Sequence, residues 1–438
     1  MQHKILIIIG FLYAMGLSGQ DLLTKEDAIK FTLQNNLGIE IAKNNLKAAK
    51  NSAAVLNSGY LPSITGNAGG SIDKQNTEGE LVTGETRTAD GVETTRYSAS
   101  INLDYTLFDG LGRLYDYKRF KELYAQSELQ VRETIENTML QLFSVYYEVA
   151  RLEENKETLS ETLKVSKDRL KRARYQFEYG QNTGLDVLNA EVDINTDSIN
   201  LLNVKQNLRN AKRDLNLVMN RDFSVGFKVD TSVVYVPNLA VEAMYAESKQ
   251  NNVQMLLMKK NMAISKYSLK ATKSGYLPTI GLTGSYGWNE SSNNNPLAFT
   301  VQNTTTGLSG GISLSWSLFD GGRTITNTKN AKIDYQNQEL LKRQTELQIE
   351  RDIKNAWDSY QNALYVLDVQ EKSLQTNQNN FQRTDERYKL GQVTSIEFRQ
   401  AQLNLLNAEL AKSQAKYNAK LAELQMLQVS GQLLNTDF

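Results

Sequence analysis

Two periodic patterns of apolar and polar residues run along this chain, and both occur in each half. The shorter pattern has a period of two: in residues 97–108, Ile101 and Leu103 share one face, whereas Ser98 and Ser100 share the other. A period of two predicts a β-strand with one apolar and one polar face. Four segments follow it, namely residues 64–72, 97–108, 280–288 and 308–318.

The longer pattern places apolar residues in steps of three and four. In residues 112–179 it passes through Met139, Leu142 and Tyr146 without an intervening proline, and residues 324–390 repeat it. A pattern of this length is typical of a coiled coil, and about 67 residues at 1.5 Å each would span on the order of 100 Å. Each long helix is followed by a glycine-containing turn and a return helix. Three further segments are expected, which are helices at 24–57 and 240–273 and a small strand-and-loop join at 221–237.

Three recurring motifs indicate an internal duplication. Residues 58–62 (Ser-Gly-Tyr-Leu-Pro) recur at 274–278, an offset of 216, and residues 107–110 (Leu-Phe-Asp-Gly) recur at 318–321, an offset of 211. The turn Gly180-Gln181-x-Thr183 recurs with the same offset of 211. Repeats of this kind predict a doubled architecture. The expected organisation is a first repeat at 20–221, an equatorial linker at 222–239, a second repeat at 240–431 and a short C-terminal tail at 432–438.

Residues 1–19 are expected to form a signal peptide. Lys4 precedes an apolar run at 5–17, which ends at the small residues Ser18 and Gly19. This run is shorter than the roughly 20 residues that a membrane-spanning helix needs. A positive start, a short apolar core and a small-residue exit describe a secretory leader. A buried core helix is the alternative interpretation.

The four alternating segments are interpreted as membrane strands. Period two over about ten residues is typical of an outer-membrane β-strand, with lipid on one side and a lumen on the other. The small Ser, Thr and Gly residues of the polar faces, together with the leader, favour this over a soluble β-sandwich, which alternation alone leaves open. Residues 73–96 and 289–307 are rich in Thr, Asn, Glu and Gly and are expected to be long extracellular hairpin loops.

A four-stranded sheet with an apolar face cannot stand alone in a membrane, because its two edges would lie unpaired in hydrocarbon. Copies of the chain therefore have to close it. Two copies would give eight strands and an interior filled by side chains, whereas three would give twelve strands and a passage. The small polar residues favour the open passage, and closed cyclic symmetry is the usual form of such an assembly.

Composition excludes several classes of function. Lys+Arg and Asp+Glu both number 49, so the net charge is zero, which argues against a nucleic-acid partner. The chain has no cysteine, and its single histidine, His3, lies in the predicted leader. A mature chain without either residue cannot form a Ser-His or Cys-His nucleophile or an ordinary zinc site. It also has no Gly-Lys-Ser/Thr phosphate loop. We therefore expect no enzyme, no catalytic residue, no metal and no cofactor, although a carboxylate-based mechanism stays open.

Asp109 and Asp320 recur at the same place in the two halves. Each follows a predicted strand, precedes a predicted helix and lies beside a glycine. An acid–base role is conceivable for recurring aspartates, but this position favours a cap at the strand-to-helix corner.

These motifs, in this order and spacing, resemble the TolC-like outer-membrane efflux protein family over essentially the whole mature chain. The resemblance implies a mixed α/β membrane protein with four antiparallel membrane β-strands per protomer. A homotrimer would then carry a twelve-stranded barrel in the outer-membrane lipid and, built from the coiled-coil helices, a periplasmic α-barrel. It further implies an exit duct that receives cargo from an inner-membrane pump of the RND or ABC type through a periplasmic membrane-fusion adaptor.

The resemblance implies functional roles for two groups of residues. Adaptor hairpins in this family dock at the helix tips, which here are Gly180, Gln181, Asn182 and Thr183 in the first repeat and Gly391, Gln392, Val393 and Thr394 in the second. Simple chain reversal at these glycines is the other reading, and both can hold.

The family often carries two acids one helical turn apart at its periplasmic aperture, and the matching residues here are Glu397 and Gln400, so the second acid is lost. Their first-repeat equivalents are Asp186 and Asn189. A ring of Glu397 would attract cations. A helix-start acid stabilised by the helix dipole is an equal alternative for this residue.

A second function of a different class stays open, namely a structural coiled-coil protein that links envelope layers without transport. Long helices alone allow it, but small residues on the inner strand faces would then have no purpose. Bilayer recordings distinguish a conduit from such a linker.

Overall fold

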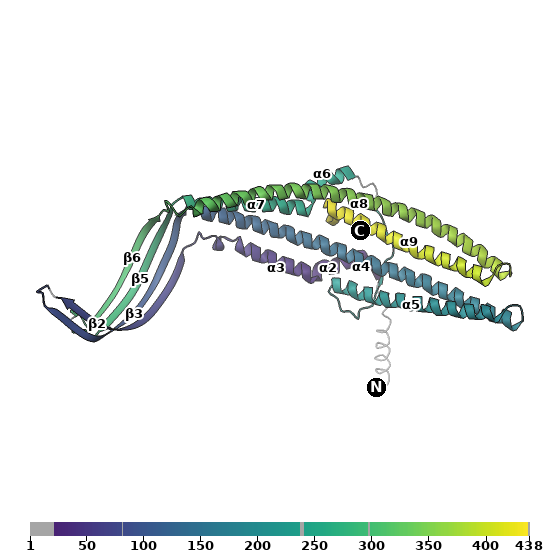
Figure 1. The fold of residues 1–438 in the computed structure, drawn as a ribbon, viewed down its shortest axis with the longest axis horizontal. Helices are drawn as coiled ribbons and strands as arrows, with labels where there is room; N and C mark the ends of the chain where they lie inside the picture. Colours follow the sequence, from purple (N-terminus) through teal and green to yellow (C-terminus); the bar gives the residue numbers. More distant parts are fainter. Residues whose placement is uncertain (1–21, 81, 237–240, 297, 437–438) are drawn as a thin grey trace, which may run out of the picture. The chain divides into compact units, whose positions relative to one another are not determined.

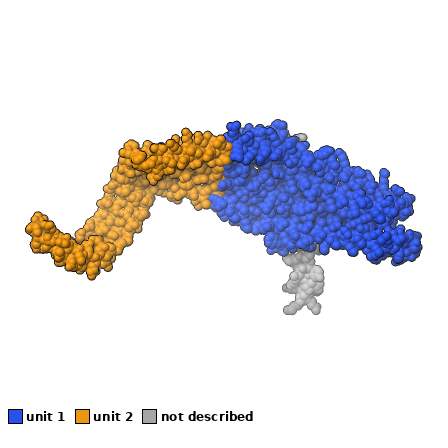
Figure 2. Space-filling view, in the orientation of Figure 1, with its two compact units in different colours: residues 1–45, 128–258, 342–438 blue, residues 46–127, 259–341 orange. Residues whose placement is uncertain are grey.

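A computed structural model describes residues 22–80, 82–236, 241–296 and 298–436. The predicted signal peptide therefore lies outside the described residues. The chain forms two compact units (Figure 2), and each unit takes segments from both halves of the sequence. Unit 1 comprises 1–45, 128–258 and 342–438, and unit 2 comprises 46–127 and 259–341.

Unit 2 contains a four-stranded antiparallel sheet (Figure 1). Its strands are β2 (Ser63–Glu80), β3 (Thr86–Asp109), β5 (Thr279–Asn293) and β6 (Gln302–Ser315), in the order β2-β3-β5-β6. The central pairing joins the two repeats, because Ile101 of β3 lies opposite Tyr286 of β5. β2 and β6 are the edges of this sheet. The four predicted strands are thus confirmed, and they are longer than the alternating segments.

The prediction of long hairpin loops at 73–96 and 289–307 is wrong. β2 continues to Glu80 and β3 begins at Thr86, while β5 continues to Asn293 and β6 begins at Gln302. Backbone hydrogen bonds hold these extensions, and Arg96 forms an ion pair with Asp73 across β2 and β3. Backbone hydrogen bonds between strands need no apolar side chains, and threonine favours strands. The polar composition of these residues therefore suggested loops where the strands in fact continue. At the other end of the sheet, β6 stops at Ser315, short of the predicted 318.

The helices include two pairs of long antiparallel partners (Figure 1). α4 (Gly112–Glu178) turns into α5 (Gly184–Val218), and α8 (Arg323–Lys389) turns into α9 (Ser395–Ser430). α4 and α8 each have 67 residues, as the pattern predicts. The described ranges also contain the 3₁₀ turns η1 (Val55–Asn57), η2 (Lys273–Tyr276) and η3 (Leu433–Asn435).

The two shorter predicted helices are each broken by an asparagine. Asn36 separates α2 (Lys25–Asn35) from α3 (Leu37–Ser52), and Asn252 separates α6 (Val241–Asn251) from α7 (Val253–Thr272). The Asn36 Nδ2 donates to the carbonyl of Val218 at 2.8 Å, and the Asn252 Nδ2 donates to that of Val429 at 2.7 Å. Each Oδ1 also accepts a backbone amide of the following helix. Each break therefore ties its helix pair to the end of a return helix.

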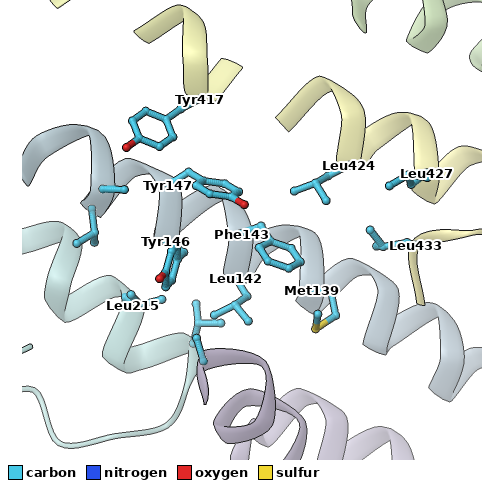
Figure 3. Close-up of a cluster of buried hydrophobic side chains, with 14 of the residues drawn as sticks. Met139, Leu142, Phe143, Tyr146, Tyr147, Leu215, Tyr417, Leu424, Leu427 and Leu433 are labelled. Atoms are coloured by element: carbon cyan, nitrogen blue, oxygen red, sulfur yellow. The ribbon is translucent and has the colours of Figure 1, made fainter. Parts of the chain in front are cut away.

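The hydrophobic core of unit 1 lies where α4, α5 and α9 meet (Figure 3). Phe143, Tyr146 and Tyr147 of α4 are buried against Tyr417 of α9 and Leu215 of α5. The Tyr146 hydroxyl donates to the carbonyl of Leu23 and accepts the amide of Asp230. These bonds secure a two-residue parallel pair, β1 (Leu22–Leu23) with β4 (Lys228–Val229). β4 is the strand of the predicted join at 221–237, whose last residue lies outside the described ranges.

One apolar stripe is exposed instead of buried. The residues that predict the return helix α5 face outward, with 59–64% of each exposed, and they are Leu185, Leu188, Val192, Ile199 and Leu202. The buried face of α5 carries Ala190, Asp197 and Leu201. No helix in the described part of the chain combines the length and the apolar character needed to cross a membrane.

Candidate functional site at the helix ends

Both helix hairpins reverse at a glycine in the left-handed region. Gly180 has φ of 69° and Gly391 has φ of 72°. After α4, the amide of Gln181 bonds the carbonyl of Gln176, and after α8 the amide of Gln392 bonds that of Arg387. These six-residue closures are Schellman turns, which need a residue without a Cβ penalty at the reversal. The glycines therefore do reverse the chain, and the side chains beside them stay outside the core.

The two return helices begin differently. Thr394 caps α9 with a full capping box, in which the Glu397 amide donates to the Thr394 hydroxyl at 3.2 Å and the Glu397 carboxylate accepts the Thr394 amide at 2.7 Å. At α5 the Thr183 side chain makes no bond to the backbone, and its hydroxyl instead donates to Asp186 at 3.3 Å. The second tip is thus the more firmly fixed of the two.

The capping box sets the ionisation of Glu397. The hydrogen bond from the Thr394 amide, followed by that from its hydroxyl, lowers the pKa of the exposed Glu397 carboxyl. A lowered pKa means that the charged form stabilises the start of α9 at neutral pH. That stabilisation is lost as the pH falls through the lowered pKa. One carboxylate oxygen of the candidate aperture acid is thus already bound to its own helix.

The other predicted aperture residues make only local contacts. Gln400 is exposed and donates to Asn404 at 2.8 Å, and Asn189 is exposed at the start of α5. Asp186 is half-buried beside Thr183. Within one protomer, the structure does not bring the Glu397 and Asp186 carboxylates into a common bonded cluster.

A buried ionic clamp joins the two hairpins above their tips, and the sequence analysis missed it. Arg399 of α9 donates to Asp197 of α5 through Nη2 at 2.7 Å and through Nη1 at 2.9 Å. Ser166 of α4 donates to the same carboxylate at 2.6 Å, and Gln402 of α9 donates to the Ser166 hydroxyl at 3.1 Å. All four residues are buried.

A second aspartate extends the clamp. Asp193 of α5 lies 3.4 Å from the Nε of Arg399 and also forms an ion pair with Arg169 of α4. Two cations thus face two anions in a site with little solvent. Such buried ion pairs fix the positions of the helices that carry them, because separating or removing one partner leaves the other as an uncompensated buried charge. A signal for it was present, since Arg399 interrupts the apolar spacing between Ile396 and Leu403.

The predicted cap residues lie in unit 2, at the base of the sheet. Asp109 accepts the amide of Arg113 at 2.8 Å, and Asp320 accepts the amides of Gly322 and Thr324 at 3.1 and 2.9 Å. These contacts support the cap interpretation over an acid–base role. In the described ranges, no group of three or more His, Cys, Asp or Glu side chains forms a candidate metal site.

A family model described as "Outer membrane efflux protein" matches residues 28–221 and 244–432. The chain belongs to the outer membrane efflux protein family. This membership confirms the resemblance stated above and makes the protein an outer-membrane channel with a periplasmic extension, not an enzyme.

Relatives of this efflux protein include the outer membrane efflux protein BepC of Brucella suis, 23% identical over 95% of this chain and 88% of the relative. The outer membrane protein TolC of Vibrio cholerae is 22% identical over 71% of this chain and 72% of its own length. Among solved structures, the Campylobacter jejuni CmeC outer membrane channel superposes with a TM-score of 0.78 at 17% identity, covering 93% of this chain and 85% of that one. The fold class is thereby confirmed.

Removing Arg399 should destabilise this efflux protein severely. Arg399→Leu leaves the Asp197 carboxylate buried, which should lower the free energy of unfolding by about 3–5 kcal/mol. The double variant Arg399→Leu/Asp197→Leu should recover most of that loss. Urea unfolding followed by circular dichroism measures both.

The control is Arg351→Leu, because Arg351 forms an ion pair with Asp352 on the surface of α8 with side-chain exposures of 63% and 43%. It should change the free energy of unfolding by less than about 1 kcal/mol. Equal losses for Arg399→Leu and Arg351→Leu would contradict a stabilising clamp.

Proposed function

We propose that three copies of this chain close into an exit duct of a tripartite efflux or type I secretion system. The duct passively conducts cargo that an inner-membrane pump of the RND or ABC type delivers through a periplasmic membrane-fusion adaptor. The name of the relative BepC, an outer membrane efflux protein, supports the efflux role. TolC-family channels form trimers, and a twelve-stranded closure leaves a passage whereas an eight-stranded one does not.

The observation that carries the proposal is that the strand pairing between the two repeats is made only once in a protomer. Within a protomer β3 pairs with β5, but their repeat equivalents, β6 and β2, are the two edges of the sheet. The offset of 211 carries β3 onto β6, and the offset of 216 carries β2 onto β5. The β6 edge of one copy can therefore pair with the β2 edge of a second copy, in the same way that β3 pairs with β5 within a protomer.

The strand-to-helix corners of the two repeats differ in the same way, because one is packed within the protomer and the other is open. At Gly110 a Cβ would lie 2.5 Å from the carbonyl oxygen of Ser274, so the first-half corner is packed against the second Ser-Gly-Tyr-Leu-Pro motif. At the equivalent Gly321 nothing lies within 4 Å. The neighbouring Leu318 and Phe319 are 80% and 85% exposed. We infer that Ser58 of another copy fills the corner at Gly321.

The helical unit carries a matching surface for assembly. The exposed stripe on α5, from Leu185 to Leu202, is the apolar face that its sequence pattern predicts for a coiled-coil contact. A stripe of this size in a single protomer indicates a protein partner. In the proposed duct, this stripe packs against a neighbouring copy and closes the periplasmic α-barrel.

The tips are proposed as the adaptor-docking surface. Gln181 and Asn182 at one tip and Gln392 and Val393 at the other stand beside the reversing glycines, outside the core. Turns that present side chains outside the core suit a contact with another hairpin. Glu397 would then ring the narrowest point of the duct, with Gln400, Asp186 and Asn189 near it.

Engineered disulfides test the closure in a chain that has no cysteine of its own. Asn102 lies opposite Ser285 within a protomer, and the repeat offsets carry this pair onto Ser313 and Gly69 of two different copies. Ser313→Cys/Gly69→Cys should therefore give covalent dimers and trimers on a non-reducing denaturing gel after oxidation in outer membranes.

Two matched pairs control this experiment. Asn102→Cys/Ser285→Cys should oxidise within one chain and leave its apparent mass monomeric. Ser313→Cys/Ala68→Cys places the thiols on opposite faces and should stay reduced. Formation of the intrachain bond without any interchain bond at Ser313 and Gly69 would count against the closure.

Conductance in planar bilayers separates the two roles of Glu397. If the carboxylate ring attracts cations, Glu397→Gln and Glu397→Ala should both lose cation preference, about severalfold at low salt and less at high salt. If Glu397 acts only as a cap, Glu397→Gln should conduct like the original protein, because its amide oxygen still accepts the Thr394 amide. A chain that never conducts would refute the duct itself.

Bulk at the second tip tests adaptor docking. Gln392→Trp should reduce export about tenfold, because a large side chain blocks the contact while the turn geometry is unchanged. Gly391→Asn is the control, since asparagine tolerates the left-handed conformation and adds little bulk. Export that survives Gln392→Trp, with normal amounts of protein in the outer membrane, would exclude this docking surface.

A further inference from the structure

An arginine joins α4 to the ends of two other helices within the protomer. Arg132 donates from Nη2 to the carbonyl of Asn251, the last residue of α6, at 2.8 Å, and to that of Gly431, just after α9, at 3.2 Å. Its Nε donates to the buried carboxylate of Glu136 at 2.8 Å. The last carbonyls of a helix carry partial negative charge and have no partner within that helix, so a guanidinium stabilises them. Arg132 thereby fixes a first-repeat helix against two second-repeat helices.

The duplication provides a second arginine at the equivalent position. The offset of 211 carries Arg132 onto Arg343 of α8. Arg343 is exposed, and within the described ranges it forms no hydrogen bond or ion pair. Glu346, which lies about one helical turn further on, is paired with Lys342 at 3.0 Å instead. The guanidinium of Arg343 is therefore available to an acceptor outside its own protomer.

The equivalent acceptors are present in the first repeat. The offset of 216 carries Asn251 onto Asn35, the last residue of α2, and the offset of 211 carries Gly431 onto Asn220, just after α5. Gly431 and Asn220 share a positive φ, of 78° and 51°. The Asn220 side chain donates to the Asn35 carbonyl at 3.2 Å, and a carbonyl oxygen has a second lone pair for another donor. Because both asparagines are exposed, this pair of helix ends is open to a partner.

Apolar residues next to these helix ends differ between the repeats in the same way. Leu37 and Ile41 of α3 are 57% and 61% exposed. Their equivalents in α7, Val253 and Leu257, are each only 7% exposed. The protomer therefore covers this face of α7 and leaves the same face of α3 without a partner.

The surroundings of Arg343 on α8 are also apolar. Leu340 and Leu347 lie three residues before it and four residues after it, and they are 67% and 62% exposed. Side chains at these spacings are neighbours on one face of a helix. Exposed leucines on both sides of an arginine indicate that a protein surface covers this face of α8.

We propose that Arg343 joins neighbouring copies of the chain. Its guanidinium donates to the carbonyls of Asn35 and Asn220 of the next copy, and the leucines that flank it pack on the open face of α3. This contact rests on the proposed closure of three copies into a duct. It adds a directional polar contact between the helices of neighbouring copies, which the apolar stripe of α5 does not provide.

Dissociation of the purified full-length trimer in mild detergent, followed by native mass over time, tests this contact. Arg343→Glu should dissociate about tenfold faster, because a carboxylate repels the helix-end carbonyls that the guanidinium binds. Arg343→Lys should dissociate at nearly the original rate, since an ammonium group still donates to carbonyls. Helical content measured by circular dichroism should be the same in both variants, because Arg343 makes no polar contact inside the described protomer.

Lys372→Glu is the matched control for reversal of a charge on α8. The Lys372 side chain is 74% exposed, and that of its repeat equivalent, Glu161, is 65% exposed, so this position faces solvent in both repeats. Its dissociation rate should stay unchanged. Equal rates for Arg343→Glu and the original protein, or equal acceleration by Arg343→Glu and Lys372→Glu, would overturn the proposal.

A photocrosslinker identifies the partner of this position. With p-benzoylphenylalanine in place of Arg343, irradiation should give a band at the mass of a dimer, and mass spectrometry should find the link near Asn35 or Asn220. A link within one chain, or to another part of the next copy, would contradict the contact. If Ser313→Cys/Gly69→Cys still joins the copies, only the Arg343 contact is then wrong. If that cysteine pair never joins copies, the closure fails and the Arg343 contact fails with it.

Discussion

The backbone groups along β2 and β6 impose the main constraint on this protein. Each edge presents amides and carbonyls with no partner strand in the described protomer, and a hydrocarbon environment offers them no water. Satisfying them requires another copy of the chain, and the duplicated sequence already contains the complementary edge. In the proposed duct, the open corner at Gly321 and the exposed stripe of α5 would also find partners in neighbouring copies. Strand pairing, corner packing and helix packing thus depend on one requirement.

Much of this architecture could be predicted because it is periodic. The 67-residue helices and the centres of all four strands carry patterns that extend over several turns or pleats, so local sequence suffices. The strand ends could not be predicted, since the pairing of residues 73–80 with 86–94 depends on backbone hydrogen bonds between mostly polar residues. The breaks at Asn36 and Asn252 were equally hidden, because their partners Val218 and Val429 lie more than 170 positions away.

The candidate site also has features that local sequence predicts and features that depend on residues far apart in the chain. Glycine at the tips and threonine before Glu397 are local signals, so both turns and the cap of α9 could be predicted from the sequence. Arg399 and Asp197 are 202 residues apart, so the interruption of the apolar spacing at Arg399 marks an unusual position but does not identify its partner. Only the fold brings them together and removes the solvent. The assignments to docking and to the aperture depend on contacts between chains, which one protomer does not contain.

The clamp also has a mechanical consequence. The repeat equivalents of its charged residues carry no charge, because the offset of 211 places Leu188 at the position of Arg399, Ala408 at that of Asp197 and Asn404 at that of Asp193. In a closed ring of three copies, contacts between hairpins within a protomer, which contain buried ion pairs, would therefore alternate with contacts between protomers that lack them and are softer. Each protomer would behave as a rigid body, and bending of the wall would concentrate at the three interfaces between protomers. The tube would then widen by sliding of whole protomers past one another, and none of them would unfold.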